Sequence, residues 1–285
     1  MSDAPETPPE TSPDARPDPR LVQLVEVWHS ACTEFVALVR DLPREQWALP
    51  TDLDGWTVKD NVAHTAHLEA VLAGAPEETI QVDEAPHVKS LMCYYTEQGV
   101  LARRGRDMDA LADEIEQAVE RRYAALLAEP PVDGSAKPSK TPGDVPWDLR
   151  TLLSNRPFDV WMHEQDIRRA VGRPGGYERA AAQHVLTVLG RGLPMVVGKR
   201  VAPAPGTVVR VSVPEAALSW TVAVGDDGRA APADHRVPAT TTVELAVEDF
   251  VVLAGGRRGP ETTRPVIEGD EDLARRLLES LAVTP

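Results

Sequence analysis

The hydrophobic pattern of this chain changes its period near residue 200, and this change constrains the fold more than any other feature. Before residue 195, apolar residues recur every three or four positions, the spacing of one buried face on an α-helix. After residue 205, apolar and β-branched residues alternate with polar ones in short runs, which is typical of β-strands. The sequence therefore predicts an α+β fold, with a helical domain followed by a small mixed domain.

The helical part is predicted to be a bundle of four or five long helices joined by loops rich in proline and glycine. Thr57, with Asp60 three residues later, resembles a capping box at the start of one helix. Pro157 lies inside another predicted helix, where a bend is expected. The helical pattern covers residues 21–42, 57–73, 88–103, 108–128, 149–171 and 177–193.

The C-terminal part is predicted to be a sheet with two helices. Strands are expected at 208–213, 218–224, 240–246 and 265–268, and helices at 248–254 and 270–281. The predicted division is a disordered, proline-rich tail over residues 1–18, a helix bundle over 19–198 and a small α/β domain over 206–285.

Composition limits the classes of function. The formal net charge of -15 argues against nucleic acid and against an anionic membrane surface as partners. The two cysteines form no CxxC motif and are too few for a disulfide framework, which fits a reducing cytoplasm. Residues 1–20 lack the apolar core of a signal peptide, and no apolar run approaches the ~20 residues that span a bilayer. We expect a cytoplasmic protein, as a monomer or homodimer.

One helix carries a pair of residues that together suit a metal ion. Asp159 and His163 are four residues apart, which places them on one face with Cβ atoms about 6 Å apart. His64, on a second predicted helix, offers a third ligand. Two imidazole nitrogens, one carboxylate oxygen and an open position describe a catalytic zinc site. Nickel, iron and manganese also accept these ligands, so the pattern predicts a divalent metal without fixing its identity.

A simpler interpretation of the same residues stays open at this point. A histidine on an apolar face is often a hydrogen-bonded core residue, and Asp159 would be an ordinary N-terminal acid if its helix began after Pro157. His67, one turn from His64, is able to replace or support it. Asp166 is expected to pair with a neighbouring arginine, Arg168 or Arg169.

Two segments resemble signatures of a known family. Gly55-Trp-Thr with Val62-Ala-His64, and Asp159-Val-Trp-Met-His163-Glu-Gln-Asp-Ile-Arg168, are similar to motifs of the mycothiol-dependent maleylpyruvate isomerase family, within the DinB/YfiT-like superfamily. The resemblance implies a DinB-like four-helix bundle and a C-terminal domain like sterol-carrier proteins. Leu253-Ala-Gly-Gly-Arg257 and Ile267-Glu-Gly-Asp270-Glu-Asp-Leu273 are similar to that second domain.

The resemblance also implies a site and an activity. The family's zinc ligands fall on His64, Asp159 and His163, although aspartate stands where the family has glutamate. A metal-bound low-molecular-weight thiol, mycothiol, would attack a small electrophile, giving S-transfer or cis–trans isomerisation. Arg257 or Arg258 would bind a substrate carboxylate. A non-catalytic metal- or ligand-binding protein and a metal-dependent hydrolase are the alternatives on the same fold.

Overall fold

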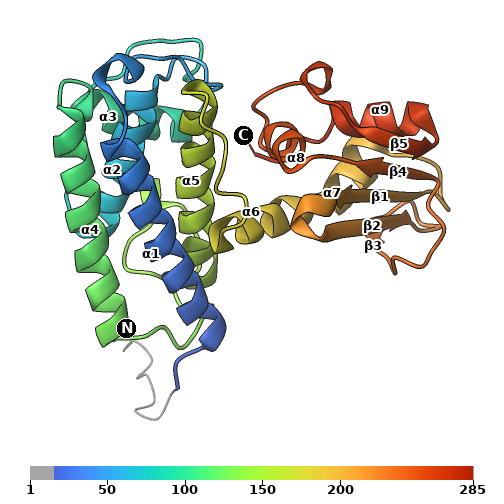
Figure 1. Cartoon of the computed structure of the whole chain (residues 1–285). Helices are drawn as coiled ribbons and strands as arrows, with labels where there is room; N and C mark the ends of the chain where they lie inside the picture. Colours follow the sequence, from blue (N-terminus) through green and yellow to red (C-terminus); the bar gives the residue numbers. More distant parts are fainter. Residues whose placement is uncertain (1–15, 285) are drawn as a thin grey trace, which may run out of the picture.

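The computed structural model describes residues 16–284, which form a helical domain and a sheet domain connected through α6 (Figure 1). Residues 1–15 of the predicted tail lie outside the described residues. The first six helices are α1 (Pro19–Arg40), α2 (Val58–Leu72), α3 (Leu91–Arg103), α4 (Met108–Ala128), α5 (Leu149–Ala170) and α6 (Ala180–Gly190).

The helical domain is a bundle in which α2 is the most enclosed helix. Helix α1 packs against α4 and α5, and α2 contacts α3, α4 and α5. Every residue of α2 from Asp60 to Val71 is therefore buried, polar residues included. A helix surrounded on all sides must pair its polar side chains inside the protein. The residues that build the candidate site come from this helix and from α5.

Local chemistry fixes where α2 begins. Gly55 has a φ of +79°, which favours glycine, and the ring of His87 packs so closely that a side chain at residue 55 would collide with it. The predicted capping box is confirmed: the Thr57 hydroxyl accepts from the Asp60 amide, and the Asp60 carboxylate accepts from the Thr57 amide. Helix α5 continues through Pro157, so Asp159 lies in its interior.

The sheet domain contains five strands in the order β3-β2-β1-β4-β5. Only the β1–β4 pair is parallel; the other three neighbouring pairs are antiparallel. The strands are β1 (Val208–Val213), β2 (Leu218–Val224), β3 (Ala230–Pro232), β4 (Thr241–Glu244) and β5 (Val266–Gly269), with helices α8 (Val247–Ala254) and α9 (Glu271–Glu279).

The α+β fold predicted from the hydrophobic pattern is confirmed, and the differences have local causes. Helix α3 begins at Leu91, three residues later than predicted, because Ser90 caps it. The three-residue strand β3 was not predicted, since it is too short to show alternation. The predicted helix over 177–193 is divided into α6 and the short α7 (Leu193–Met195), followed by the π-helical turn η3 (Val196–Val201).

Segment 193–201 continues from α6 to the sheet domain. Helix α6 packs on α5, whereas α7 and η3 contact strands β2 and β3. The predicted domain boundary near residues 199–205 stays a prediction. Helix α7 precedes that boundary, η3 overlaps it, and both pack against the sheet. Among the helices of residues 16–284, none combines the length and apolar character needed to cross a membrane.

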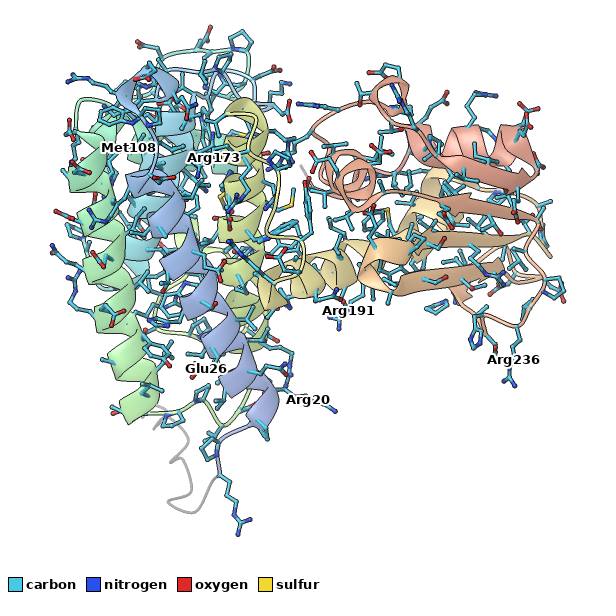
Figure 2. The ribbon with its side chains drawn as sticks, viewed as in Figure 1. Arg20, Glu26, Met108, Arg173, Arg191 and Arg236 are labelled. Carbon is cyan, nitrogen blue, oxygen red and sulfur yellow. The ribbon has the colours of Figure 1, made fainter. Side chains whose placement is uncertain are left out.

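Many arginines lie on the surface, which makes the buried ones conspicuous. Figure 2 shows Arg20, Arg191 and Arg236 extending outward from the two domains. Arg156, by contrast, is among the largest fully buried side chains of the molecule. A buried guanidinium must be paired, and Arg156 donates to the carboxylates of Glu69 and Asp159.

Candidate metal centre

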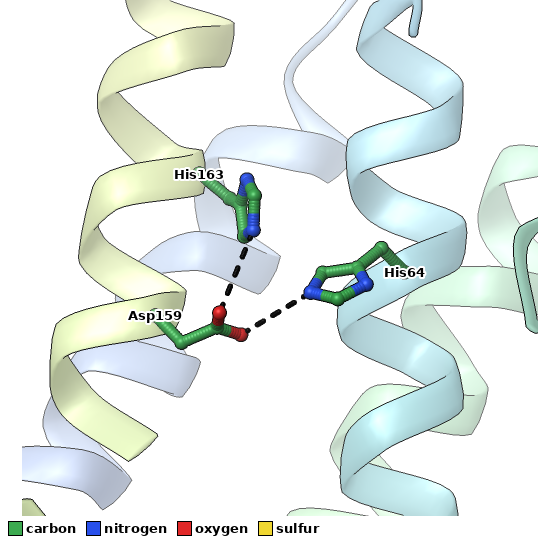
Figure 3. Close-up of side chains that lie close together, drawn as sticks. All are labelled: His64, Asp159 and His163. Atoms are coloured by element: carbon green, nitrogen blue, oxygen red, sulfur yellow. Dashed lines mark ion pairs between the residues drawn. The ribbon is translucent and has the colours of Figure 1, made fainter. Parts of the chain in front are cut away.

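Helices α2 and α5 bring His64, Asp159 and His163 together (Figure 3). Each residue offers one ligand atom, and these atoms lie within 4.8 Å of one another. Nε2 of His64 is 3.4 Å from Oδ2 of Asp159, and Nε2 of His163 is 3.6 Å from Oδ1 of the same carboxylate. Both imidazoles are buried, while 22% of the Asp159 side chain is exposed. The cluster is therefore closed on the histidine side and reaches solvent at the carboxylate.

A hydrogen bond from α2 orients His163. Nδ1 of His163 lies 2.8 Å from Oδ1 of Asn61, whose amide nitrogen donates to Thr51 and to the Thr57 carbonyl. Because an amide oxygen only accepts, Nδ1 carries a hydrogen, and Nε2 is the ring nitrogen that faces Asp159. Metal-binding histidines use this arrangement to fix their ring orientation.

The Trp56 ring forms an apolar wall beside the cluster. Its centroid is 5.0 Å from that of His64 and 5.9 Å from that of His163. Its indole nitrogen donates to the buried carboxylate of Glu97, which holds the ring in place. An apolar wall limits access of water and strengthens charge interactions at the site.

The environment favours the cation-binding protonation states at His64 and Asp159. At His163 burial lowers the pKa of the imidazole, but the carboxylates of Asp159 and Asp166 outweigh burial and raise that pKa above its usual value. Burial lowers the pKa of His64 and outweighs the opposing charge of Asp159, so this imidazole is neutral. Burial alone would raise the pKa of Asp159, but the Arg156 guanidinium and the two histidines hold it well below its usual range. A neutral imidazole and an ionised carboxylate are the forms that ligate metals.

The residues present fit a divalent cation. The donor set has two nitrogens and one oxygen, and the three groups come from two rigid helices. Nδ1 of His64 is buried and lacks a hydrogen-bond partner within residues 16–284. Zinc is one of several divalent ions that such a set accepts. The shorter aspartate reaches the two histidines because α2 and α5 are in contact.

The predicted arginines come from the segment after α8 and face the helical domain. Arg257 donates to both carboxylate oxygens of Asp166, at 3.1 and 3.0 Å, and Asp166 lies 3.3 Å from Nδ1 of His163. Arg258 donates to Asp52 at 2.9 Å. Only 8% of the Arg257 side chain is exposed, against 42% for Arg258. The sheet domain thus contacts the surroundings of the site, and Arg257 is already engaged by a carboxylate.

Other predicted residues fall outside the triad. The expected pairing of Asp166 with Arg169 is confirmed, while Arg168 pairs with Glu164. His67 is buried beside Arg103 and is not part of the cluster that would hold a metal.

Sequence reasoning missed two neighbours of the triad. Asn61 lies three residues before His64, and Arg156 lies three residues before Asp159, the spacing at which helical side chains share a face. That spacing was the available signal for both residues.

Comparisons with known proteins relate most of the helical domain to a known domain family. Residues 28–168 match the model described as the mycothiol maleylpyruvate isomerase N-terminal domain. A search of curated proteins found no match. Among solved structures, the mycothiol-dependent maleylpyruvate isomerase is 17% identical, with a TM-score of 0.53, 84% of this chain covered and 90% of that one. A His-to-Ala variant of that enzyme is 16% identical, with a TM-score of 0.53 and coverages of 86% and 92%. At these identities the solved structures show a shared fold.

Proposed function

Since residues 28–168 belong to the mycothiol maleylpyruvate isomerase N-terminal domain family, we propose that this chain is a metal-dependent enzyme that activates a low-molecular-weight thiol. Mycothiol is the first thiol to test, and the second substrate is a small electrophile. The observation that carries the proposal is the convergence of His64, Asp159 and His163 from two helices. The sequence pattern alone left these residues open to a purely structural interpretation.

Each residue has a defined part in this proposal. His64, Asp159 and His163 hold the cation, and Asn61 fixes the tautomer of His163. A bound divalent cation lowers the pKa of a coordinating thiol, so that the thiolate is present at neutral pH. Trp56 limits water at the site, which favours attack by sulfur over hydrolysis. No cysteine of the chain is required as nucleophile.

The electrophile sets the outcome of thiolate attack. With an enedioic acid, the thiolate would add to the C=C bond and turn it into a single bond. Rotation about that carbon–carbon bond and elimination of the thiolate would then give cis–trans isomerisation. With an epoxide, the thioether would form as the ring C–O bond breaks and the alkoxide takes a proton. With an alkyl halide, the halide ion would leave, and addition to a quinone would give a hydroquinone thioether. Arg258 is the better placed of the two arginines to bind a substrate carboxylate, because its side chain is more exposed and makes one hydrogen bond to a carboxylate, whereas that of Arg257 makes two.

The test is turnover of the zinc-loaded protein with maleylpyruvate, and separately with an epoxide, each in the presence and absence of mycothiol. We expect product only when the thiol is present, and loss of product in His163→Ala. The control is His67→Gln, which changes a buried histidine of α2 outside the triad. Thiol-independent hydrolysis of the epoxide would favour the hydrolase, and metal binding without turnover would favour a binding protein.

A further inference from the structure

Four buried or largely buried charges of alternating sign lead from the triad into the bundle. Nη1 of Arg156 donates to Oδ2 of Asp159 at 3.2 Å. The other side of the same guanidinium, Nε and Nη2, donates to Oε1 of Glu69 at 3.0 and 2.8 Å. Oε2 of Glu69 faces Arg122 at 3.5 Å. The series Asp159–Arg156–Glu69–Arg122 therefore crosses from α5 through α2 to α4.

The burial of this series rules out an incidental surface pair. The side chain of Glu69 is fully buried, that of Arg156 is 1% exposed and that of Arg122 is 10% exposed. The Arg122 guanidinium also lies over the Trp28 ring, 4.6 Å from its centroid. Isolated charges at such depth are costly, and each member of the series lies beside an opposite charge.

We propose that Arg156 is a positioning residue for the metal ligand Asp159, and that Glu69 and Arg122 hold Arg156 in that role. This inference rests on the proposed function, because it assumes that Asp159 binds a cation. Arg156 donates to Oδ2 of the carboxylate, and within residues 16–284 no guanidinium pairs with Oδ1, the oxygen nearer His163. The planar fork of arginine reaches Asp159 and Glu69 at once, whereas lysine offers a single point charge.

A purely structural role predicts a different outcome. If Arg156 served only to neutralise Glu69, its replacement would change the free energy of unfolding. Metal affinity would stay unchanged, because Arg122 would still face Glu69 and Asp159 would not depend on Arg156. If it orients Asp159, replacement lowers metal affinity, as loss of an outer partner of a ligand typically does by about 10–100-fold. Affinity for the metal alone therefore separates the two roles without any assay of catalysis.

The experiment measures the dissociation constants of zinc and cobalt by competition with a chromophoric chelator, after circular dichroism has shown that each protein is folded. The variants are Arg156→Lys and Arg156→Met. The matched controls are Arg103→Lys and Arg103→Met, which alter another buried arginine that pairs with two acids, Glu78 and Glu114. If Arg156→Met does not fold, Arg156→Lys, which keeps the charge, decides the question.

We expect both Arg156 variants to bind metal about 10–100-fold more weakly than the wild type, with an altered cobalt absorption spectrum. The Arg103 variants should stay within about twofold, because sites without shared partners act independently. Unchanged or tighter binding in the Arg156 variants would overturn the inference and leave the proposed function intact. Absence of metal binding in the wild type would instead overturn the proposed function itself.

Discussion

Neighbouring arginines of the sheet domain provide a sharp test of how the two domains are held together. Arg257 and Arg258 both donate to carboxylates of the helical domain, but their surroundings differ. Arg257 has 8% of its side chain exposed and makes two hydrogen bonds to the fully buried Asp166. Arg258 is 42% exposed and makes one hydrogen bond to Asp52. The burial of each ion pair, and not the number of ion pairs, should therefore determine how much each replacement lowers the free energy of unfolding.

We predict that Arg257→Met lowers the free energy of unfolding by about 3 kcal/mol. Breaking a buried ion pair costs about 3–5 kcal/mol, and the lower end applies because Arg169 still neutralises Asp166. Arg258→Met should cost less than about 1 kcal/mol, since exposed pairs contribute little. Urea unfolding of the metal-free protein, followed by circular dichroism and tryptophan fluorescence, measures both.

An equal loss of unfolding free energy in the two variants, or a larger loss in Arg258→Met, would refute this prediction. Either result would mean that Arg257 is not held by Asp166 in solution. A gain of stability in Arg257→Met would show that the methionine packs better than the ion pair, which the buried bidentate geometry argues against.

Three further predictions concern helix α2 and its neighbour α3. Gly99→Ala should cost about 1–3 kcal/mol in urea unfolding, because its Cβ would lie 2.1 Å from the His67 ring. Gly105→Ala, whose Cβ would meet nothing within 4 Å, should leave stability unchanged or raise it; similar losses in both would contradict the packing argument. Burial, assisted by the charge of a nearby arginine, lowers the pKa of His67 to about 3, below the value of about 6.5 in the unfolded chain. The unfolded state then binds more protons below pH 6.5, so stability falls by about 1.4 kcal/mol per pH unit as the pH decreases toward 3. His67→Gln should flatten the dependence of the urea midpoint on pH between 6.5 and 4, and an unchanged slope would show that other groups cause it. Asn61→Ala should weaken zinc binding by about 10–100-fold through loss of the hydrogen bond to His163, as measured by chelator competition, and wild-type affinity would refute that role.

The fold was predictable because most elements carry their own local signals. The capping box of Thr57 and Asp60 placed the start of α2, and alternation in 208–213 and 218–224 matched β1 and β2 to the residue. Segment 193–201 was less predictable, since a π-helical turn arises from packing against the sheet and leaves no clear periodicity. Strand β3 depends in the same way on pairing with β2.

The candidate site was predictable only in part, for a physical reason. The four-residue spacing of Asp159 and His163 is local, so it was visible in the sequence. The approach of His64 depends on how α2 packs on α5. The sequence offered His64 as a third ligand on a second helix, and the resemblance to a family strengthened that expectation, but no local pattern encodes the approach itself. The engagement of Arg257 by Asp166 is a contact between domains, 91 residues apart, which no local pattern encodes.

The measurement that tests the central claim most directly is the zinc content of protein purified without chelators. It compares the wild type with His64→Ala, Asp159→Ala and His163→Ala, and uses His67→Ala as the control on the same helix. The account predicts about one equivalent of zinc in the wild type and the control, and its loss in the three triad variants. Metal-free wild-type protein that does not bind added zinc or another divalent ion would contradict it and leave the triad as a set of paired core residues.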